Sequence, residues 1–122
     1  MSPEILKNRT FDFAINVMRM IDELPSCKPH DVVSYRLIKS STSVGANYRA
    51  ACKAKSPADF VNKLKIVEEE ADESEYWLDL LKAYGKGKTK SVETLLKEAN
   101  ELNRIFSASA RTAKSNNKMK LK

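Results

Sequence analysis

The sequence predicts an all-α protein, specifically an antiparallel up-down four-helix bundle. Three observations lead to this prediction. The chain has only 3 Gly and 4 Pro in 122 residues, which favours long helices over turn-rich sheet. Apolar residues recur at alternating spacings of three and four along several segments. These segments begin or end at capping or helix-breaking residues, and the connections between them are short. The length fits one domain, which we place at residues 1–115, with a basic flexible tail at 116–122.

The first helix has a clear start. Ser2-Pro3-Glu4 supplies an N-cap, a proline at the first helical position and an acid in the first turn. The helix ends at Leu24-Pro25, because the residue before proline disfavours the helical conformation. Helical spacing then predicts that the face turned toward the core consists of Phe11, Ala14, Met18 and Ile21.

The second helix follows a loop. Residues 26–31 include Pro29 and predict a loop, with Asp31 as the cap of a helix that runs to about Lys53. The spacing predicts an inward face of Leu37, Ser41, Val44, Tyr48 and Ala51.

The third and fourth helices carry the most regular stripes. Ser56-Pro57-Ala58-Asp59 is the clearest helix start in the chain, and that helix should stop near Gly85. Its stripe is Phe60, Leu64, Val67, Ala71, Ser74, Leu78 and Leu81. Ser91 is the predicted cap of the fourth helix, whose stripe is Val92, Leu95, Ala99, Leu102, Phe106, Ser109 and Ala113. Both stripes fit the slightly inclined packing of a bundle.

The second helix also has an unusual outer face, low in profile and basic. Lys39, Thr42, Ala46, Arg49 and Lys53 repeat the bundle spacing on this side. Glycine costs a helix roughly 1 kcal/mol relative to alanine, so the presence of Gly45 in this helix suggests a close approach by another group. That group is either a helix, from the bundle or from a second subunit, or a nucleic-acid backbone; a partly solvated helix with incidental small residues is the third possibility. The candidate oligomer interface is Thr42, Ser43, Gly45, Ala46 and Ala50.

Charge is segregated along the chain, whose net charge is +6 with a pI near 9.3. Residues 32–58 contain five bases and no acid, whereas residues 66–81 contain seven acids and no base. These segments can pair within one chain or between neighbouring chains. Another basic block near the C-terminus has no acid beside it and is available to an external polyanion. The candidate phosphate contacts are Lys39, Arg49, Lys53, Lys55, Arg111, Lys114 and Lys118. At helical spacing, Tyr48, Tyr76 and Trp77 are more typical of core or interface anchors than of base-stacking residues.

The sequence argues against catalytic chemistry. A di-iron bundle needs Glu-x-x-His on two helices, but the only histidine is His30, in a predicted loop. Cys27 and Cys52 lack a supporting catalytic constellation and are expected to be buried or idle thiols. Residues 86–89 resemble the end of a phosphate-binding loop, yet the required earlier glycine is replaced by Lys82 and a helix precedes them, so they are interpreted as a linker. We therefore expect no enzyme, no cofactor and no bound metal. No segment is apolar enough to span a membrane.

Three runs of sequence resemble one known family. They are Ser41-Thr42-Ser43-Val44-Gly45-Ala46-Asn47-Tyr48-Arg49, residues 59–66 (DFVNKLKI) and residues 70–78 (EADESEYWL). Together with residues 95–102 (LLKEANEL), they are similar to the 23S rRNA intervening-sequence proteins, also called the four-helix bundle protein family. The likeness covers most of the chain and is weakest in the first helix.

The resemblance implies a cytoplasmic bacterial protein that forms a four-helix bundle and assembles as a ring-like homopentamer. Relatives include the accessory variability proteins of diversity-generating retroelements, basic pentamers that bind nucleic acid and a reverse transcriptase. The family offers no catalytic residues. Ala50 departs from it, since members often carry an acid after the arginine, and this change makes the second helix more uniformly basic.

Two hypotheses follow for the function. The first is a non-enzymatic, homo-oligomeric protein that binds nucleic acid, RNA in particular, through basic surfaces with low sequence specificity. The alternative is an oligomeric scaffold for a protein partner such as a reverse transcriptase, in which the segregated charge serves self-assembly.

Overall fold

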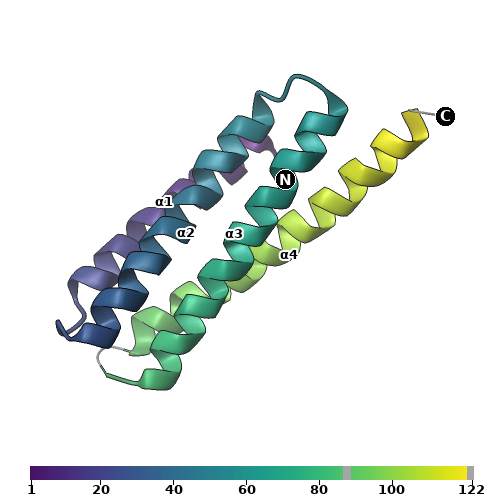
Figure 1. The fold of residues 1–122 in the computed structure, drawn as a ribbon. Helices are drawn as coiled ribbons and strands as arrows, with labels where there is room; N and C mark the ends of the chain where they lie inside the picture. The colour runs from purple at the N-terminus through teal and green to yellow at the C-terminus, as the bar shows by residue number, and fades with distance from the viewer. Residues whose placement is uncertain (87–88, 121–122) are drawn as a thin grey trace.

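A computed structural model describes residues 1–86 and 89–120 as four helices, and no strand occurs among them. They are α1 (Pro3–Asp22), α2 (Lys28–Cys52), α3 (Pro57–Tyr84) and α4 (Thr89–Lys120). Figure 1 shows them running alternately up and down, with each helix beside the next one in the chain. The predicted all-α fold with four helices is therefore confirmed.

Side-chain capping explains where α1 and α3 begin, whereas the predicted cap of α4, Ser91, is wrong because the chain is already helical at Thr89. The hydroxyl of Ser2 accepts a hydrogen bond from the Ile5 N–H at 3.3 Å, and that of Ser56 accepts one from the Asp59 N–H at 3.0 Å, both as predicted. The predicted start of α2 at Asp31 is wrong, because the helix begins at Lys28. Proline in the first turn is compatible with a helix, since the N–H that it lacks has no intrahelical partner there. His30 consequently lies in a helix rather than a loop.

The helix ends correct one further expectation. Gly85 adopts a left-handed conformation (φ 74°) and its N–H donates to the Leu81 carbonyl at 3.2 Å, which confirms the predicted stop. In contrast, α4 continues to Lys120, so most of the segment predicted as a flexible tail is helical. At about 1.5 Å per residue, its 32 residues span roughly 48 Å against roughly 30 Å for the 20 residues of α1. Residues 87–88, within the predicted linker, and residues 121–122 lie outside the described part of the chain.

The core confirms the stripes of three helices and corrects that of α1. The predicted inward residues of α2 are all buried, as are those of α3 except Phe60, which is half-buried. In α4, Ala110 rather than Ser109 continues the stripe. In α1 the prediction is wrong for Phe11 and Met18, which face outward. The buried face is instead Leu6, Thr10, Phe13, Val17 and Met20.

A threonine at the centre of the true face obscured the α1 pattern. Thr10 is fully buried, and its hydroxyl lies 2.8 Å from the Leu6 carbonyl and 3.1 Å from the Lys7 carbonyl. Because the helix itself accepts its hydrogen bond, burying this polar side chain carries little penalty. The other α1 face has a similar number of large apolar residues, so periodicity alone could not choose between them.

The close approach suggested by Gly45 comes from α1 of the same chain. A Cβ atom added at Gly45 would lie 3.2 Å from Thr10 Oγ1 and 3.4 Å from Thr10 Cβ. Gly45 therefore lets α1 and α2 pack closely, and no second subunit is needed to explain this residue. On the other side of α1, Arg9 ties the helix to α4 with Nη2 at 2.7 Å and Nε at 3.0 Å from the Glu98 carboxylate, which raises the pKa of Arg9.

Candidate nucleic-acid and self-association surfaces

One end of the bundle gathers basic side chains from three separate parts of the sequence. The start of α1, the turn between α2 and α3, and the last turns of α4 all line a hollow of about 640 Å³. Among its lining residues are Lys7 from α1, Ala54 from the turn and Asn116 from α4. We call this the basic end and define it by Lys7, which lines the hollow, and by the bases on the other two segments: Lys53, Lys55, Arg111, Lys114 and Lys118.

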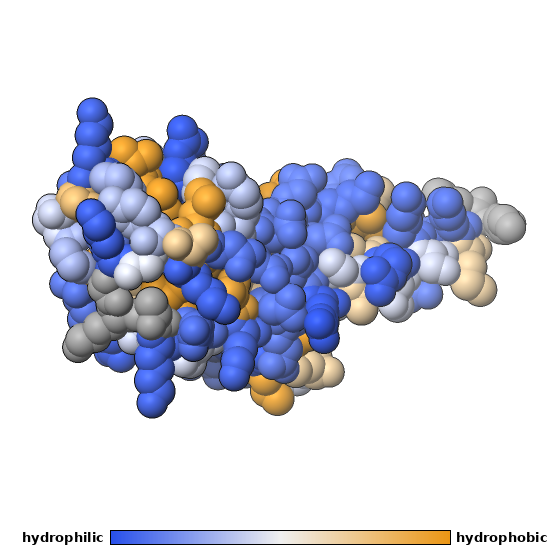
Figure 2. All heavy atoms as spheres, turned by 90° about the horizontal axis from the view of Figure 1, so that it is seen from below, coloured by the Kyte–Doolittle hydropathy of each residue, from blue (hydrophilic) through white to orange (hydrophobic). Residues whose placement is uncertain are grey.

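Acids are scarce at the basic end. The sequence has no Asp or Glu after Glu101, so the projecting part of α4 is wholly basic or neutral. Two acids lie close by: Glu4 is exposed in the first turn of α1, and Asp59 forms an ion pair with Lys63 and accepts the Lys55 N–H at 3.1 Å, contacts that lower the pKa of Asp59. Figure 2 shows the bundle narrowing toward one side into a segment that is largely hydrophilic. The basic end thus has an excess of positive charge with little local compensation.

Two of the candidate phosphate contacts lie elsewhere. Five of the candidates lie at the basic end and are exposed, as a phosphate contact must be: Lys53, Lys55, Arg111, Lys114 and Lys118. Lys39 is exposed farther along α2, near Glu70 of α3. Burial raises the pKa of Glu70, as do the charges of Glu73 and Glu69, whereas Lys39 opposes the shift. Arg49 lies at a different feature, described next.

An apolar groove of about 260 Å³ runs between α1 and α2 on the outside of the bundle. Its lining from α1 includes Phe11 and Met18, which are 62% and 37% exposed. Arg49 and Lys7 are its charged lining residues. The candidate interface residues Thr42, Gly45 and Ala46 also line it, whereas Ser43 and Ala50 do not. We call this the α1–α2 groove, and define it by Lys7, Phe11, Ala14, Ile15, Met18, Thr42, Gly45, Ala46 and Arg49.

The α1 side of this groove was not predicted, because Phe11 and Met18 were expected in the core. The available signal was a second apolar stripe on the same helix. Two stripes on one helix indicate that one of them is left for a partner or for solvent.

The outer face of α3 carries a further exposed stripe. Ile66, Glu69, Glu73, Tyr76 and Leu80 follow one another at spacings of three and four, on the side opposite the buried stripe. The three apolar members are 41%, 55% and 37% exposed. We call these five residues the α3 ridge. Tyr76 packs edge to face against Trp77 with ring centroids 5.0 Å apart, and Trp77 Nε1 donates to Glu73 Oε1 at 3.3 Å.

The two tyrosines and the tryptophan therefore have different roles. Tyr48 is a core residue, as expected, with its ring centroid 5.3 Å from that of Phe106. Burial, together with the neighbouring Cys52 thiol, raises the pKa of Tyr48 to about 12. Tyr76 is a surface residue and Trp77 is half-buried beside it.

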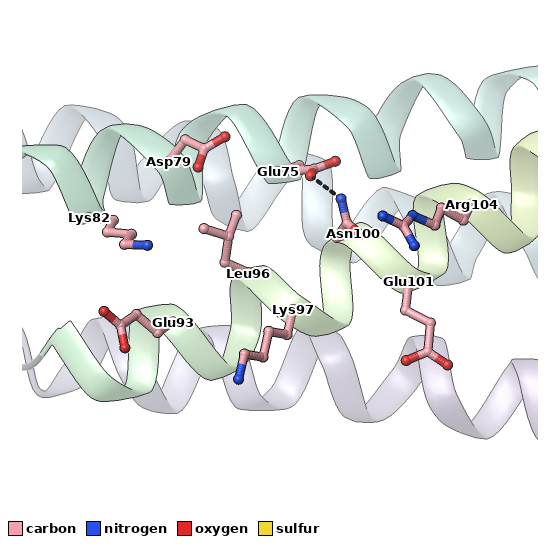
Figure 3. Close-up of a pocket in the computed structure, with 9 residues that line it drawn as sticks. All are labelled: Glu75, Asp79, Lys82, Glu93, Leu96, Lys97, Asn100, Glu101 and Arg104. Carbon is pink, nitrogen blue, oxygen red and sulfur yellow. Dashed lines mark hydrogen bonds between the residues drawn. The ribbon is translucent and has the colours of Figure 1, made fainter.

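Another groove, of about 660 Å³, lies between α3 and α4. Figure 3 shows acidic and basic side chains together along both walls, with Leu96 between them. The Asn100 amide donates to Glu75 Oε2 at 2.8 Å, and Asn103 donates to Glu75 Oε1 at 3.0 Å. Because both signs alternate here and amides of α4 occupy Glu75, this groove is poorly suited to a polyanion.

Among the described residues, the expected pairing of α2 bases with α3 acids is limited to the approach of Lys39 to Glu70, which does not form an ion pair. Among the residues that the structure describes, no ion pair joins these two helices; the ion pairs connect Arg9 with Glu98 and Glu101, and Lys63 with Asp59. The acids of the α3 ridge are consequently left facing outward.

His30 and the two cysteines differ in how deeply they are buried. His30 is buried, with Nδ1 2.7 Å from the Pro25 carbonyl oxygen and its ring edge to face with Tyr84. Cys27 is half-buried and Cys52 is exposed, and both thiols are free. Within residues 1–86 and 89–120, no three His, Cys, Asp or Glu side chains are grouped to hold a metal. No helix in this described part is long and apolar enough for a membrane span.

Comparison with known proteins identifies the family. No curated protein sequence matches the chain. A solved crystal structure from Bacteroides thetaiotaomicron, described as a protein with unknown function from the S23 ribosomal protein family, is similar with a TM-score of 0.81 and 32% sequence identity. The match covers 91% of this chain and 99% of that one. A sequence model of the 23S rRNA-intervening sequence proteins matches residues 5–108, and the chain therefore belongs to this family.

Proposed function

We propose that this protein is a non-enzymatic, homo-oligomeric RNA-binding protein that uses its basic end with low sequence specificity. The observation that carries the proposal is the convergence of exposed bases from the α2–α3 turn and the end of α4, beside Lys7 of α1, at one end with few acids. The family takes its name from 23S rRNA intervening sequences, which supports RNA over DNA as the proposed ligand.

A surface rich in lysine and arginine binds RNA through electrostatic contacts with its phosphates. Bases that neutralise phosphates release condensed counterions, so affinity falls steeply as salt rises. Backbone contacts of this kind carry no sequence information, which accounts for the low specificity. Assembly multiplies the effect: five chains of +6 each would carry about +30, ample for this mode of binding. The ring-like homopentamer and a cytoplasmic location belong to the same proposal.

The test compares two variants with equal loss of charge. The first is Lys53→Gln, Lys55→Gln, Lys114→Gln and Lys118→Gln at the basic end. The matched control carries Lys82→Gln, Lys86→Gln, Lys90→Gln and Lys97→Gln, four exposed lysines near the opposite end and along the α3–α4 groove. Fluorescence anisotropy with a labelled RNA hairpin measures Kd across a salt series.

We expect the basic-end variant to lower the slope of log Kd against log salt by about 3, at 0.7–0.9 per lost phosphate contact. The control should retain most of the original slope. Equal losses in both variants, or no binding by the unmodified protein at low salt, would contradict the proposal.

The scaffold for a protein partner, such as a reverse transcriptase, is the second candidate. The exposed apolar residues of the α1–α2 groove and the α3 ridge favour it, because patches of this kind mark protein contacts. A basic-end variant that leaves RNA binding unchanged, together with an oligomer indifferent to salt and RNA, would make the scaffold the better account.

A further inference from the structure

We propose that the α1–α2 groove of one copy receives the α3 ridge of a second copy, in a head-to-tail contact. This inference rests on the homo-oligomeric part of the proposed function and adds the two surfaces that make the contact. It assigns a partner to the exposed apolar residues on α1 and α3, which the bundle itself leaves uncovered.

The groove has the shape and chemistry to accept a helix. Phe11, Ile15 and Met18 supply apolar side chains from α1, whereas Thr42 and Ala46 keep the α2 wall low. Gly45 also brings α1 and α2 close together, since its missing Cβ leaves room for Thr10. A phenylalanine that is 62% exposed at the edge of an apolar groove gains free energy when another surface removes it from water.

The α3 ridge is the matching feature on the same molecule. Its spacing of three and four forms a continuous row along the helix, and such a row packs into the furrow between side chains of other helices. Tyr76 stands out from this row and rests against Trp77, which fixes its position. Aromatic side chains held in this way are favourable anchors because little conformational freedom is lost on binding.

Charge decides in favour of a second copy. The charged residues that line the groove are Lys7 and Arg49, both basic, while the ridge carries the acids Glu69 and Glu73. Ridge against groove therefore places opposite charges together, and groove against groove or ridge against ridge places like charges together. Glu69 and Glu73 also crowd Glu70, so an approaching base relieves repulsion within α3.

The contact is heterologous, because groove and ridge occupy different helices of one chain. Each copy then uses its groove toward one neighbour and its ridge toward the other. Contacts of this type produce a closed ring when the rotation between copies closes, and an open chain when it does not.

A mixing experiment exploits this asymmetry. The groove variant is Ala46→Glu, which adds bulk and an acid facing the acids of the ridge. The ridge variant is Tyr76→Ser with Leu80→Ser, which removes its apolar contacts. The control removes two exposed apolar side chains outside both surfaces, Val32→Ser with Met119→Ser. Light scattering coupled to size exclusion measures the mass of each protein, and circular dichroism measures its helix content.

We expect the unmodified protein and the control to be oligomeric and each variant to be a 13.8 kDa monomer. An equimolar mixture of the two variants should form a heterodimer of twice that mass, since one intact ridge still meets one intact groove. A monomeric unmodified protein, variants that keep the oligomer, or folded monomeric variants that remain monomeric when mixed would each overturn the inference. If Ala46→Glu fails to fold, Met18→Gln replaces it, because Met18 lies at the groove surface.

The proposed contact between copies and the proposed RNA binding can fail independently of each other in these experiments. Both variants keep all the lysines and arginines of the basic end. If they assemble as expected while the unmodified protein binds no RNA, the contact stands and the proposed RNA binding fails. If RNA binds with the expected salt dependence but the mixture forms no heterodimer, the inference fails alone.

Discussion

Replacing Gly45 tests how closely α1 and α2 pack. In an exposed helix, Gly→Ala stabilises by about 1 kcal/mol through helix propensity. Here the new Cβ would lie 3.2 Å from Thr10 Oγ1, so one side chain must shift by a few tenths of an ångström. Thr10 resists the shift because its hydroxyl is held by carbonyls of its own helix at 2.8 Å and 3.1 Å. Overpacking of a core typically costs about 1–3 kcal/mol, so we expect Gly45→Ala to destabilise or to be neutral at best.

A double-mutant cycle isolates this steric contribution. In a Thr10→Ala background the obstructing hydroxyl is gone, and Gly45→Ala should stabilise by about 1 kcal/mol. The two substitutions should therefore couple by at least about 1 kcal/mol. Urea denaturation at one fixed protein concentration measures the four free energies of unfolding, with equal concentration because the protein is expected to assemble. Equal stabilisation by Gly45→Ala in both backgrounds would refute the reasoning.

Two further substitutions test electrostatic contacts. Glu70 has a folded-state pKa raised above its ordinary value of 4.5, first by burial and then by Glu73 and Glu69, so its contribution to stability falls as the pH rises from there through the folded pKa. Glu70→Gln should therefore raise the melting temperature at pH 7 and lose this advantage near pH 4; a uniform effect at all pH values would argue against the assignment. Arg9→Lys should lower the free energy of unfolding by about 1 kcal/mol through loss of the two-pronged contact with Glu98, and less in 1 M salt. No loss in low salt would show that the α1–α4 contact does not depend on this geometry.

Helical periodicity predicted the buried face most reliably in helices where one face is clearly more apolar than the others. In α2 and α3 one face carries the regular stripe, and the residues assigned to it are buried except Phe60, which is half-buried; the α3 ridge on the opposite face is interrupted by two acids. In α1 two faces compete, and the buried one contains Thr10, whose polarity counts against it in any pattern. Helix ends followed the same logic: the Ser2 and Ser56 caps and Gly85 were recognisable, but Ser91 lies within α4 rather than at its cap, and a proline within the first turn of α2 was interpreted as part of a loop.

The sequence identified candidate phosphate contacts and candidate interface residues, but the structure was needed to show which of them lie together in space. Lys53 and Lys114 lie far apart in the sequence, and the meeting of the α2–α3 turn with the end of α4 brings their segments together. Arg49 is close to Lys53 in the sequence, about one helical turn away, but it lines the α1–α2 groove instead. The α3 ridge went unrecognised because its acids were considered as a charge run and its apolar residues were not considered as a row.

From the amino-acid sequence alone we could derive the number of helices, the buried faces of α2 and α3, the absence of acids from residues 32–58 and the family resemblance. These are local properties, since helical periodicity and capping depend on neighbours within a few residues. Only the tertiary structure decided which α1 face is buried, that Gly45 accommodates Thr10, and that bases from three segments share one end. Such properties depend on which helices lie side by side, and packing between distant segments cannot be read from spacing within one of them.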